Sequence, residues 1–210
     1  EGRPTDIYAY PINEANGIIE EFMIAANQAV AKTFTAKRAP FLYRVHELPD
    51  PEKLDRFVRT SKLMNVHVKF KDAVPDTREL ARILDQVKAT PYEAVLSQLL
   101  LQSLAKARYS EQPPLGHYGL GIHDYSHFTS PIRRYPDLFI HRVIKGYLND
   151  SRRERKWRKA APDVALHCSE TEREAMYAEY DTVDQKVAEY MSERLGEHYT
   201  ARISGMIDAG

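Results

Sequence analysis

The strongest constraint on the fold is a helical repeat of apolar residues near the start of the sequence. Between Asn13 and about Phe34, apolar side chains recur at steps of four, three and four residues: Ile18, Phe22, Ala25 and Ala29. This spacing places them on one face of an α-helix, and Asn13 is a suitable N-cap. Because such a face must be buried against other elements, the pattern predicts a helical core.

Similar signals continue along the chain. Further helices are predicted at residues 51–64, 76–88, 91–108, 131–148 and 167–195. Asp50 is expected to cap the helix that begins at Pro51. A short strand is predicted at residues 66–70, a long ordered loop at 109–130, and a charged surface stretch between the last two helices. The sequence therefore predicts an α+β fold in which helices dominate.

Both ends of the sequence resemble cut ends. The chain begins at Glu1 without a methionine and closes on "YTARISGMIDAG", which has the alternation and glycines of a first strand and turn in a β-domain. We therefore expect an internal piece of a longer protein.

Composition excludes several kinds of site and partner. Cys168 is the single cysteine, so neither an intramolecular disulfide nor a thiolate metal cluster is possible. Lysine plus arginine and aspartate plus glutamate both number 30, so any contact with nucleic acid must be local. The sequence shows no secretory signal, membrane span or lipidation motif, and we expect a cytoplasmic protein without a membrane partner.

The segment "SHFTSPIRRYPDL", residues 126–138, places two arginines at a predicted helix start. With Thr129 or Ser130 as cap and Pro131 at the first position, Arg133 and Arg134 fall in the first turn, where the helix dipole disfavours cations. Free backbone N–H groups and guanidinium groups together form a site for a phosphate. The alternative is that Arg133 pairs with a carboxylate one turn later.

Two other predicted helices carry carboxylates in unusual places. The first has a second stripe, opposite the apolar one, that is polar but flanked by apolar residues: Asn16, Glu20, Met23 and Asn27. These groups either face water or meet the hydroxyls of a ligand. On the last helix, Glu179 falls at the edge of an inner stripe: Met176, Val183, Val187 and Tyr190. It is either a charge at the rim or a ligand contact.

No metal or nucleophile motif accompanies these groups. The histidines of the central region, His117, His123, His127 and His141, lack zinc-binding spacing. We interpret His127 and His141 as hydrogen-bonding structural residues. No serine or cysteine lies in a nucleophile motif, and no glycine-rich phosphate loop is present.

The segment "GLGIHDYSHFTSPIRRYPDLFIHRVI" resembles the signature of the ribonuclease II and ribonuclease R family of exoribonucleases. "EANGIIEEFMIAANQAVA" is similar to the glutamate helix of that family, and "HCSETEREAMYAEYDTVDQKVAEYM" to the helix that closes its catalytic RNB domain. The resemblance implies that residues 1–198 are the C-terminal portion of this domain. Residues 199–210 resemble the start of a C-terminal OB-fold RNA-binding domain.

The resemblance also implies roles for individual residues. Arg133 corresponds to the catalytic arginine that holds the scissile phosphate, and Glu179 to a carboxylate that contacts the terminal nucleotide. Glu20 or Glu21 corresponds to the glutamate that contacts ribose, and helical geometry favours Glu20. Ser130, Arg134 and Tyr135 belong to the same RNA-binding motif. Tyr180 stands where many members have arginine, which argues against a second cation there.

The aspartate cluster that holds Mg²⁺ in this family has no counterpart in the sequence. The resemblance implies a Mg²⁺-dependent enzyme that degrades single-stranded RNA from the 3′ end to 5′-mononucleotides. The chain would supply the phosphate and ribose contacts, would need the upstream part of the same polypeptide, and would be inactive alone. Two alternatives are a non-catalytic RNA-binding paralogue and a helical scaffold in which protein carboxylates pair with both arginines.

Overall fold

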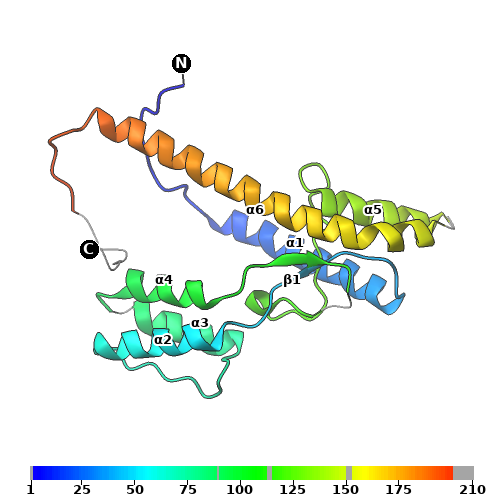
Figure 1. Cartoon of the computed structure of the whole chain (residues 1–210), viewed down its shortest axis with the longest axis horizontal. Coiled ribbons are helices and arrows are strands. Elements are labelled where there is room, and N and C mark those ends of the chain that lie inside the picture. The colour runs from blue at the N-terminus through cyan, green and yellow to red at the C-terminus, as the bar shows by residue number, and fades with distance from the viewer. Residues whose placement is uncertain (1, 89, 113–114, 150–152, 201–210) are drawn as a thin grey trace.

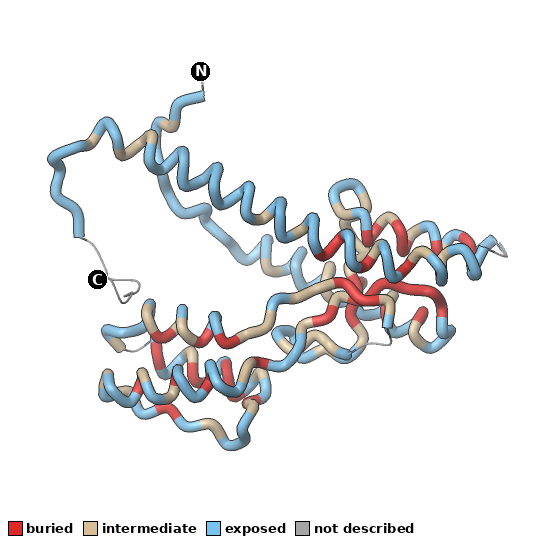
Figure 2. Tube along the Cα trace, in the orientation of Figure 1, coloured by how far each residue is buried: buried red, intermediate tan, exposed pale blue. Residues whose placement is uncertain are grey.

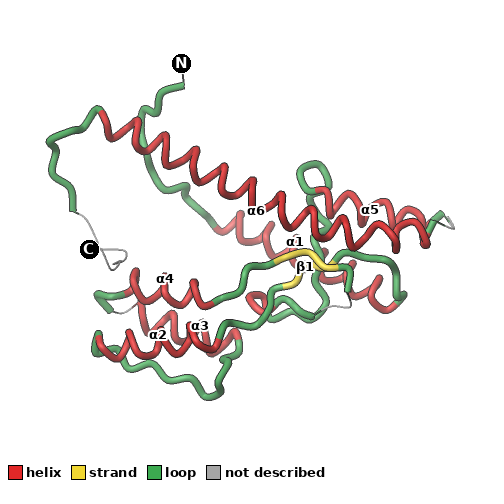
Figure 3. Tube along the Cα trace, viewed as in Figure 1, coloured by secondary structure: helices red, strands yellow, loops and turns green. Residues whose placement is uncertain are grey.

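A computed structural model describes residues 2–88, 90–112, 115–149 and 153–200 of the chain. Its elements, in chain order, are α1 (Glu14–Ala36), β1 (Tyr43–Val45), α2 (Pro51–Leu63), α3 (Thr77–Lys88), α4 (Glu93–Ser103), β2 (Arg108–Ser110), the 3₁₀ turn η1 (Tyr118–Leu120), α5 (Tyr135–Leu148) and α6 (Glu154–Ser192). Helices dominate, as the sequence predicts (Figure 3). None of the described helices has the length and apolar character needed to cross a membrane.

The helices form two packed groups, each around its own apolar cluster. α2, α3 and α4 enclose one cluster, in which Phe57, Ile83 and Leu96 are fully buried. α1, α5, β1, β2 and the first part of α6 enclose the other, which includes Phe41, Ile140 and Val143. Figure 1 shows the two groups at separate places in the molecule, and Figure 2 shows that burial is concentrated within them.

A small antiparallel sheet forms part of the second group, at the point where the chain passes to and from the α2–α3–α4 group. β1 pairs with β2, and Arg44 lies opposite Tyr109 in the register. β1 precedes α2 and β2 follows α4, so the strands are the two points where the chain enters and leaves the three-helix group. The sheet therefore holds that group next to the α1–α5–α6 group.

Several predicted elements are confirmed. Asn13 caps α1 and forms a reciprocal capping box with Asn16, which satisfies two free backbone N–H groups at the helix start. Asp50 caps α2 ahead of Pro51. Helix α3 follows the predicted bounds closely, whereas α4 ends at Ser103 rather than at residue 108, because the chain turns there into β2.

The predicted strand at residues 66–70 is wrong. The segment has no strand partner among the described residues, and Val68 and Phe70 instead pack against the α2–α3–α4 cluster. A strand needs a neighbour for its backbone hydrogen bonds, whereas apolar alternation alone only shows that every second residue is buried.

The start of α5 also differs from the prediction. Residues Pro131–Arg133 form a turn, and the helix begins at Tyr135 with Arg134 at the N-cap position. The backbone N–H groups of Arg133 and Arg134 both donate to the carbonyl of Ser130. Since the turn precedes the helix, neither arginine lies inside the first helical turn, and the side chain of Ile132 is fully exposed.

α6 starts much earlier than predicted. It begins at Glu154, includes Pro162, and replaces the expected charged surface stretch. All of its buried residues lie between Ala161 and Ser169, among them Cys168. Beyond that point the helix extends away from the body beside the first described residues, where Lys186 Nζ donates to the carbonyl of Gly2 at 2.8 Å (Figure 1).

The predicted inner faces of α1 and α6 are wrong. On α1, Ile18 and Phe22 are exposed, and the buried residues are Asn27, Ala31 and Phe34. On α6, Val183 is more than half exposed. The apolar repeat locates a helix correctly, but contacts made elsewhere decide which face is covered. The stretch predicted as the start of an OB-fold falls almost wholly in residues 201–210, outside the described residues.

Candidate functional site

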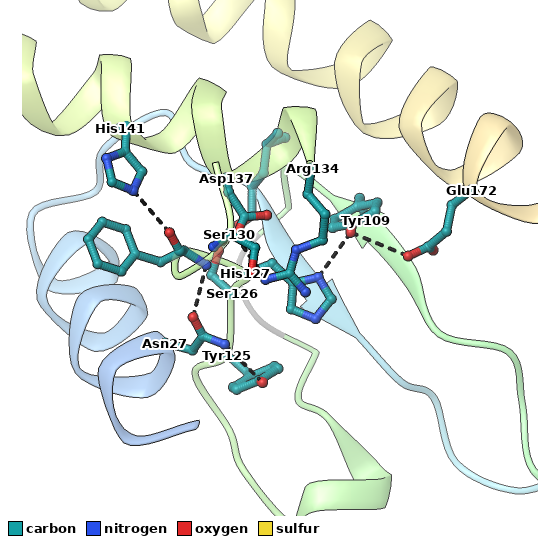
Figure 4. Close-up of polar contacts among 12 residues, drawn as sticks. Asn27, Tyr109, Tyr125, Ser126, His127, Ser130, Arg134, Asp137, His141 and Glu172 are labelled. Carbon is teal, nitrogen blue, oxygen red and sulfur yellow. Dashed lines mark hydrogen bonds and ion pairs between the residues drawn. The ribbon is translucent and has the colours of Figure 1, made fainter. Parts of the chain in front are cut away.

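The segment that contains the two arginines is anchored to α1 and β1 by buried polar contacts. Asn27 of α1 accepts a hydrogen bond from the backbone N–H of Phe128 at 2.9 Å. Its amide Nδ2 donates to Tyr125 Oη at 3.1 Å. Ser126, fully buried, donates through its hydroxyl to the carbonyl of Leu42. These contacts fix residues 125–128 between the helix and the sheet (Figure 4).

Asp137 organises the turn that follows. Its Oδ1 accepts from the backbone N–H of Ser130 and from Arg134 Nη2, each at 2.8 Å. The Asp137 side chain is 0% exposed and that of Arg134 17% exposed, so this is a buried ion pair. Removing one partner of such a pair leaves a buried charge without compensation. Arg134 is therefore held in place by the fold.

Arg133, in the same turn, differs from Arg134 in exposure and in ion pairing. Its side chain is exposed, and no described carboxylate lies within ion-pair distance of it. The sequence left open an ion pair between Arg133 and a carboxylate one turn later. In the structure that carboxylate, Asp137, pairs with Arg134 instead. The scaffold alternative requires both arginines to be paired, and among the described residues only Arg134 is.

A second polar network adjoins Arg134. Tyr109 Oη lies 2.9 Å from His127 Nδ1 and 3.4 Å from Glu172 Oε1. Arg44 donates to Glu172 at 2.6 Å, and its guanidinium lies 4.7 Å from the centre of the Tyr109 ring. The network joins both strands to α6 (Figure 4).

Burial controls the protonation of this network. Burial, followed by the nearby charges of Arg134 and Arg44, lowers the pKa of His127 to about 2. Burial also raises the pKa of Tyr109 well above its ordinary value. Both side chains are therefore neutral near pH 7.

The polar stripe of α1 lines an open cavity of about 270 Å³, in which Asn27 is buried while Asn16 and Glu20 are exposed. Glu20 and Asn27 of this stripe share the cavity with Tyr125 and Arg134. The cavity therefore combines a carboxylate, an amide, a phenol and a guanidinium, groups that bind hydroxyls and phosphates. Glu20 and Glu21 are both exposed, but only Glu20 lines the cavity.

The remaining predicted site residues lie outside this cavity. Ser130 contributes its backbone N–H to Asp137. Tyr135 starts α5, is half exposed, and accepts a hydrogen bond from Arg142 at 3.3 Å. Glu179 is exposed on the projecting part of α6. Of the predicted site residues, the cavity brings together Glu20 and Arg134; the roles of Arg133 and Glu179 stay predictions.

The histidines behave as structural residues. His141 Nε2 lies 2.9 Å from the carbonyl of Phe128, and the two rings are stacked with centroids 4.4 Å apart. The part of the chain that the structure describes contains no group of three or more His, Cys, Asp or Glu side chains able to hold a metal ion.

Sequence reasoning did not anticipate the residues that support the site. Arg44, Tyr109 and Glu172 come from three separate elements. The signal available for Glu172 was its position two helical turns before Glu179 on the same helix, which places both on one side of α6. Nothing in the local sequence links that helix to Arg44.

Comparison with known proteins agrees with this arrangement. A family model described as the RNB domain matches residues 1–150. The chain is 38% identical over its full length to ribonuclease R 1 of Lactococcus lactis and to ribonuclease R of Thermotoga maritima. It spans only 26% and 30% of their respective lengths.

Solved structures give the same result. RNase R of Mycoplasma genitalium, in complex with ribose-methylated single-stranded RNA, superimposes with a TM-score of 0.89 at 30% identity. That match covers 96% of this chain and 32% of the other. Yeast Ssd1, a pseudonuclease, superimposes with a TM-score of 0.60 at 24% identity. That match covers 73% of this chain and 19% of Ssd1, and at this identity it supports a shared fold only. The chain belongs to the RNB-domain family of exoribonucleases that includes ribonuclease R.

Proposed function

We propose that the chain is the substrate-holding part of a hydrolytic exoribonuclease that degrades single-stranded RNA from its 3′ end to 5′-mononucleotides. The observation that carries the proposal is that two adjacent arginines differ in exposure and in ion pairing. Arg134 is buried against Asp137, whereas Arg133 is exposed and without a described carboxylate partner. An exposed arginine beside a buried, fixed one is suited to bind an anion that arrives from solvent.

The cavity beside these arginines supports a ribose contact. Glu20 presents carboxylate oxygens that can bind sugar hydroxyls, and Arg134 lies in the same cavity. We assign Glu20, rather than Glu21, to the ribose. We assign Arg133 to the scissile phosphate and Glu179 to the terminal nucleotide, with Ser130 and Tyr135 as further RNA contacts.

The described residues do not fit a Mg²⁺ site, because they contain no cluster of carboxylates able to ligate one. We propose that carboxylates in an upstream part of the same polypeptide hold the ion. When bound, Mg²⁺ would supply activation of the attacking water. The residues of this chain position the strand and stabilise negative charge on the phosphoryl oxygens.

Arg133 should act mainly on the rate of hydrolysis. A preformed donor is worth most where charge develops in the transition state, and losing one costs on the order of 10²-fold or more in turnover. In the protein joined to its upstream part, we expect Arg133→Ala to lose that much turnover and only a few-fold in RNA affinity. Arg133→Lys should restore little, because lysine keeps the charge without the planar fork.

The measurement is single-turnover hydrolysis of a labelled oligonucleotide together with its affinity in EDTA. Arg155→Ala, which removes another exposed arginine, is the matched control and should leave both values unchanged. If Arg133→Ala weakens binding strongly but hydrolyses bound RNA at the parental rate, the catalytic assignment is wrong. If the parental protein binds RNA and never hydrolyses it, the non-catalytic RNA-binding alternative replaces the enzyme.

A further inference from the structure

A groove between α5 and α6 concentrates positive charge away from the α1 cavity. The two helices lie side by side and are joined at one end of the molecule (Figure 1). The groove has a volume of about 690 Å³, and its lining includes four cationic side chains: Arg142 and Lys145 from α5, Arg153 at the N-cap of α6, and Lys156 from α6. None of its described lining residues is acidic.

The positive charge is concentrated in this groove and is not spread over the whole chain. The chain as a whole carries equal numbers of acidic and basic residues, so a cluster of four exposed cations is not a general property of its surface. No described carboxylate pairs with any of the four; the ion pair near the start of α6 joins Arg158 to Glu154 instead. Four like charges in one groove repel one another, and an anion that enters the groove relieves that repulsion.

Aromatic side chains lie among the cations. Trp157 is partly buried against the core and lines the groove, as does Tyr135. Arg142 donates to Tyr135 Oη at 3.3 Å, and its guanidinium lies 5.7 Å from the ring centre. A basic groove with aromatic faces binds single-stranded nucleic acid, because phosphates meet the cations and bases stack on the rings. An acidic peptide would use the cations alone.

We infer that the α5–α6 groove is an auxiliary binding site for single-stranded RNA, separate from the α1 cavity. The inference rests on the proposed function in one respect: Tyr135 both lines the groove and follows Arg133 and Arg134 directly, so the groove begins where the proposed RNA contacts end. The part of a strand that lies outside the active site would occupy it.

The test uses the 210-residue chain in EDTA, so that no hydrolysis occurs. The affinity of labelled oligouridylates of about 4 and about 16 nucleotides, lengths that bracket a single-stranded site, is measured by fluorescence anisotropy at several salt concentrations. The groove variant replaces Arg142, Lys145, Arg153 and Lys156 with Gln. Its control replaces four other exposed cations with Gln: Lys62, Lys69, Arg155 and Lys159. Both variants lose the same charge.

The groove variant should bind the longer oligonucleotide at least about tenfold more weakly at 0.1 M salt and should bind the short one as before. The slope of log affinity against log salt should fall by about 3, because each phosphate contact to a single strand contributes about 0.7. If the quadruple variant does not fold, the Arg142/Lys145 and Arg153/Lys156 double variants should each lower the slope by about 1.4.

Three results would overturn the inference. One is an equal loss in the control variant, which would mean a general charge effect. Another is an unchanged slope in the groove variant. The third is competition by polyglutamate that matches competition by unlabelled RNA of equal charge, which would assign the groove to an acidic peptide. None of these results depends on turnover, so a failure of the groove and a failure of the proposed enzyme remain distinguishable.

Discussion

Asp137 decides which of the two adjacent arginines is held in an ion pair. It is fully buried, and its Oδ1 holds both Arg134 and the backbone N–H of Ser130. The sequence located the pair of arginines and predicts an anion-binding site there. It could not identify the arginine that Asp137 takes, because moving the helix start by a few residues changes which guanidinium faces that carboxylate.

His127 should make the protein less stable in mild acid. The pKa of His127 is lowered to about 2 in the folded chain by burial, with nearby Arg134 and Arg44 adding to the effect. In the unfolded chain the pKa of this imidazole returns to about 6.5. Below that value the unfolded state binds a proton that the folded state excludes. The free energy of unfolding should therefore fall, by up to about 1.4 kcal/mol per pH unit from this residue.

Urea unfolding at pH 7, 6 and 5 measures this effect in the wild type and in His127→Gln. The glutamine can still bond Tyr109 but cannot take up a proton, so its stability should decline less steeply with falling pH. His67→Gln, at an exposed histidine, is the matched control and should follow the wild type. Parallel curves for wild type and His127→Gln would show that the two states protonate His127 alike.

At the scale of single elements, α1 depends on one amide for its contact with the segment that precedes α5. Asn27 satisfies the backbone N–H of Phe128 and donates to Tyr125. Asn27→Ala should leave that N–H buried without a partner, which costs about 1–3 kcal/mol. Thermal or urea unfolding measures the loss. Gln28→Ala, on the exposed side of the same helix, should change stability by less than about 0.5 kcal/mol, and equal effects of the two changes would contradict the assigned role.

The elements that sequence patterns predicted well are those whose signals are local. Asn13 and Asp50 cap their helices through their own side chains. The first part of α6 was missed because the pattern there is dominated by charged residues and by Pro162. Those charged residues lie beside the α5–α6 groove. A proline normally weakens a helix interior, yet α6 continues through Pro162. The long-range contacts of residues 154–165 with α5 outweigh the unfavourable local sequence.

At the scale of the whole molecule, the sequence identified the family, but not the way the chain is assembled. The face of α1 that bears Asn27 is buried because Tyr125 and Phe128 meet it, and these residues lie about 100 positions away along the chain. Likewise, Tyr109 joins Glu172 and His127 only after β1 and β2 have paired. Such partners are set by topology, which a single sequence does not display.

The 210-residue chain alone should not hydrolyse RNA when Mg²⁺ is added. The sequence lacks the aspartate cluster that the family resemblance requires, and two-metal hydrolysis needs such carboxylate ligands. Incubating the purified chain with a labelled oligonucleotide and Mg²⁺ tests this. A parallel sample of Arg133→Ala controls for contaminating nuclease, since contamination would be insensitive to that change. Magnesium-dependent release of mononucleotides that disappears in Arg133→Ala would show that the chain holds its own metal site.

The length of α6 has a mechanical consequence. Its buried residues end at Ser169 and its side-chain contacts with the body continue to Tyr177, which accepts from Lys106, yet the helix runs on to Ser192. At 1.5 Å per residue the projecting part, residues 178–192, is roughly 22 Å long. A straight helix of this kind is a lever whose fulcrum is the packed stretch between Ala161 and Ser169. A small rotation at the fulcrum becomes a much larger displacement at the far end, and the α5–α6 groove lies beside that fulcrum.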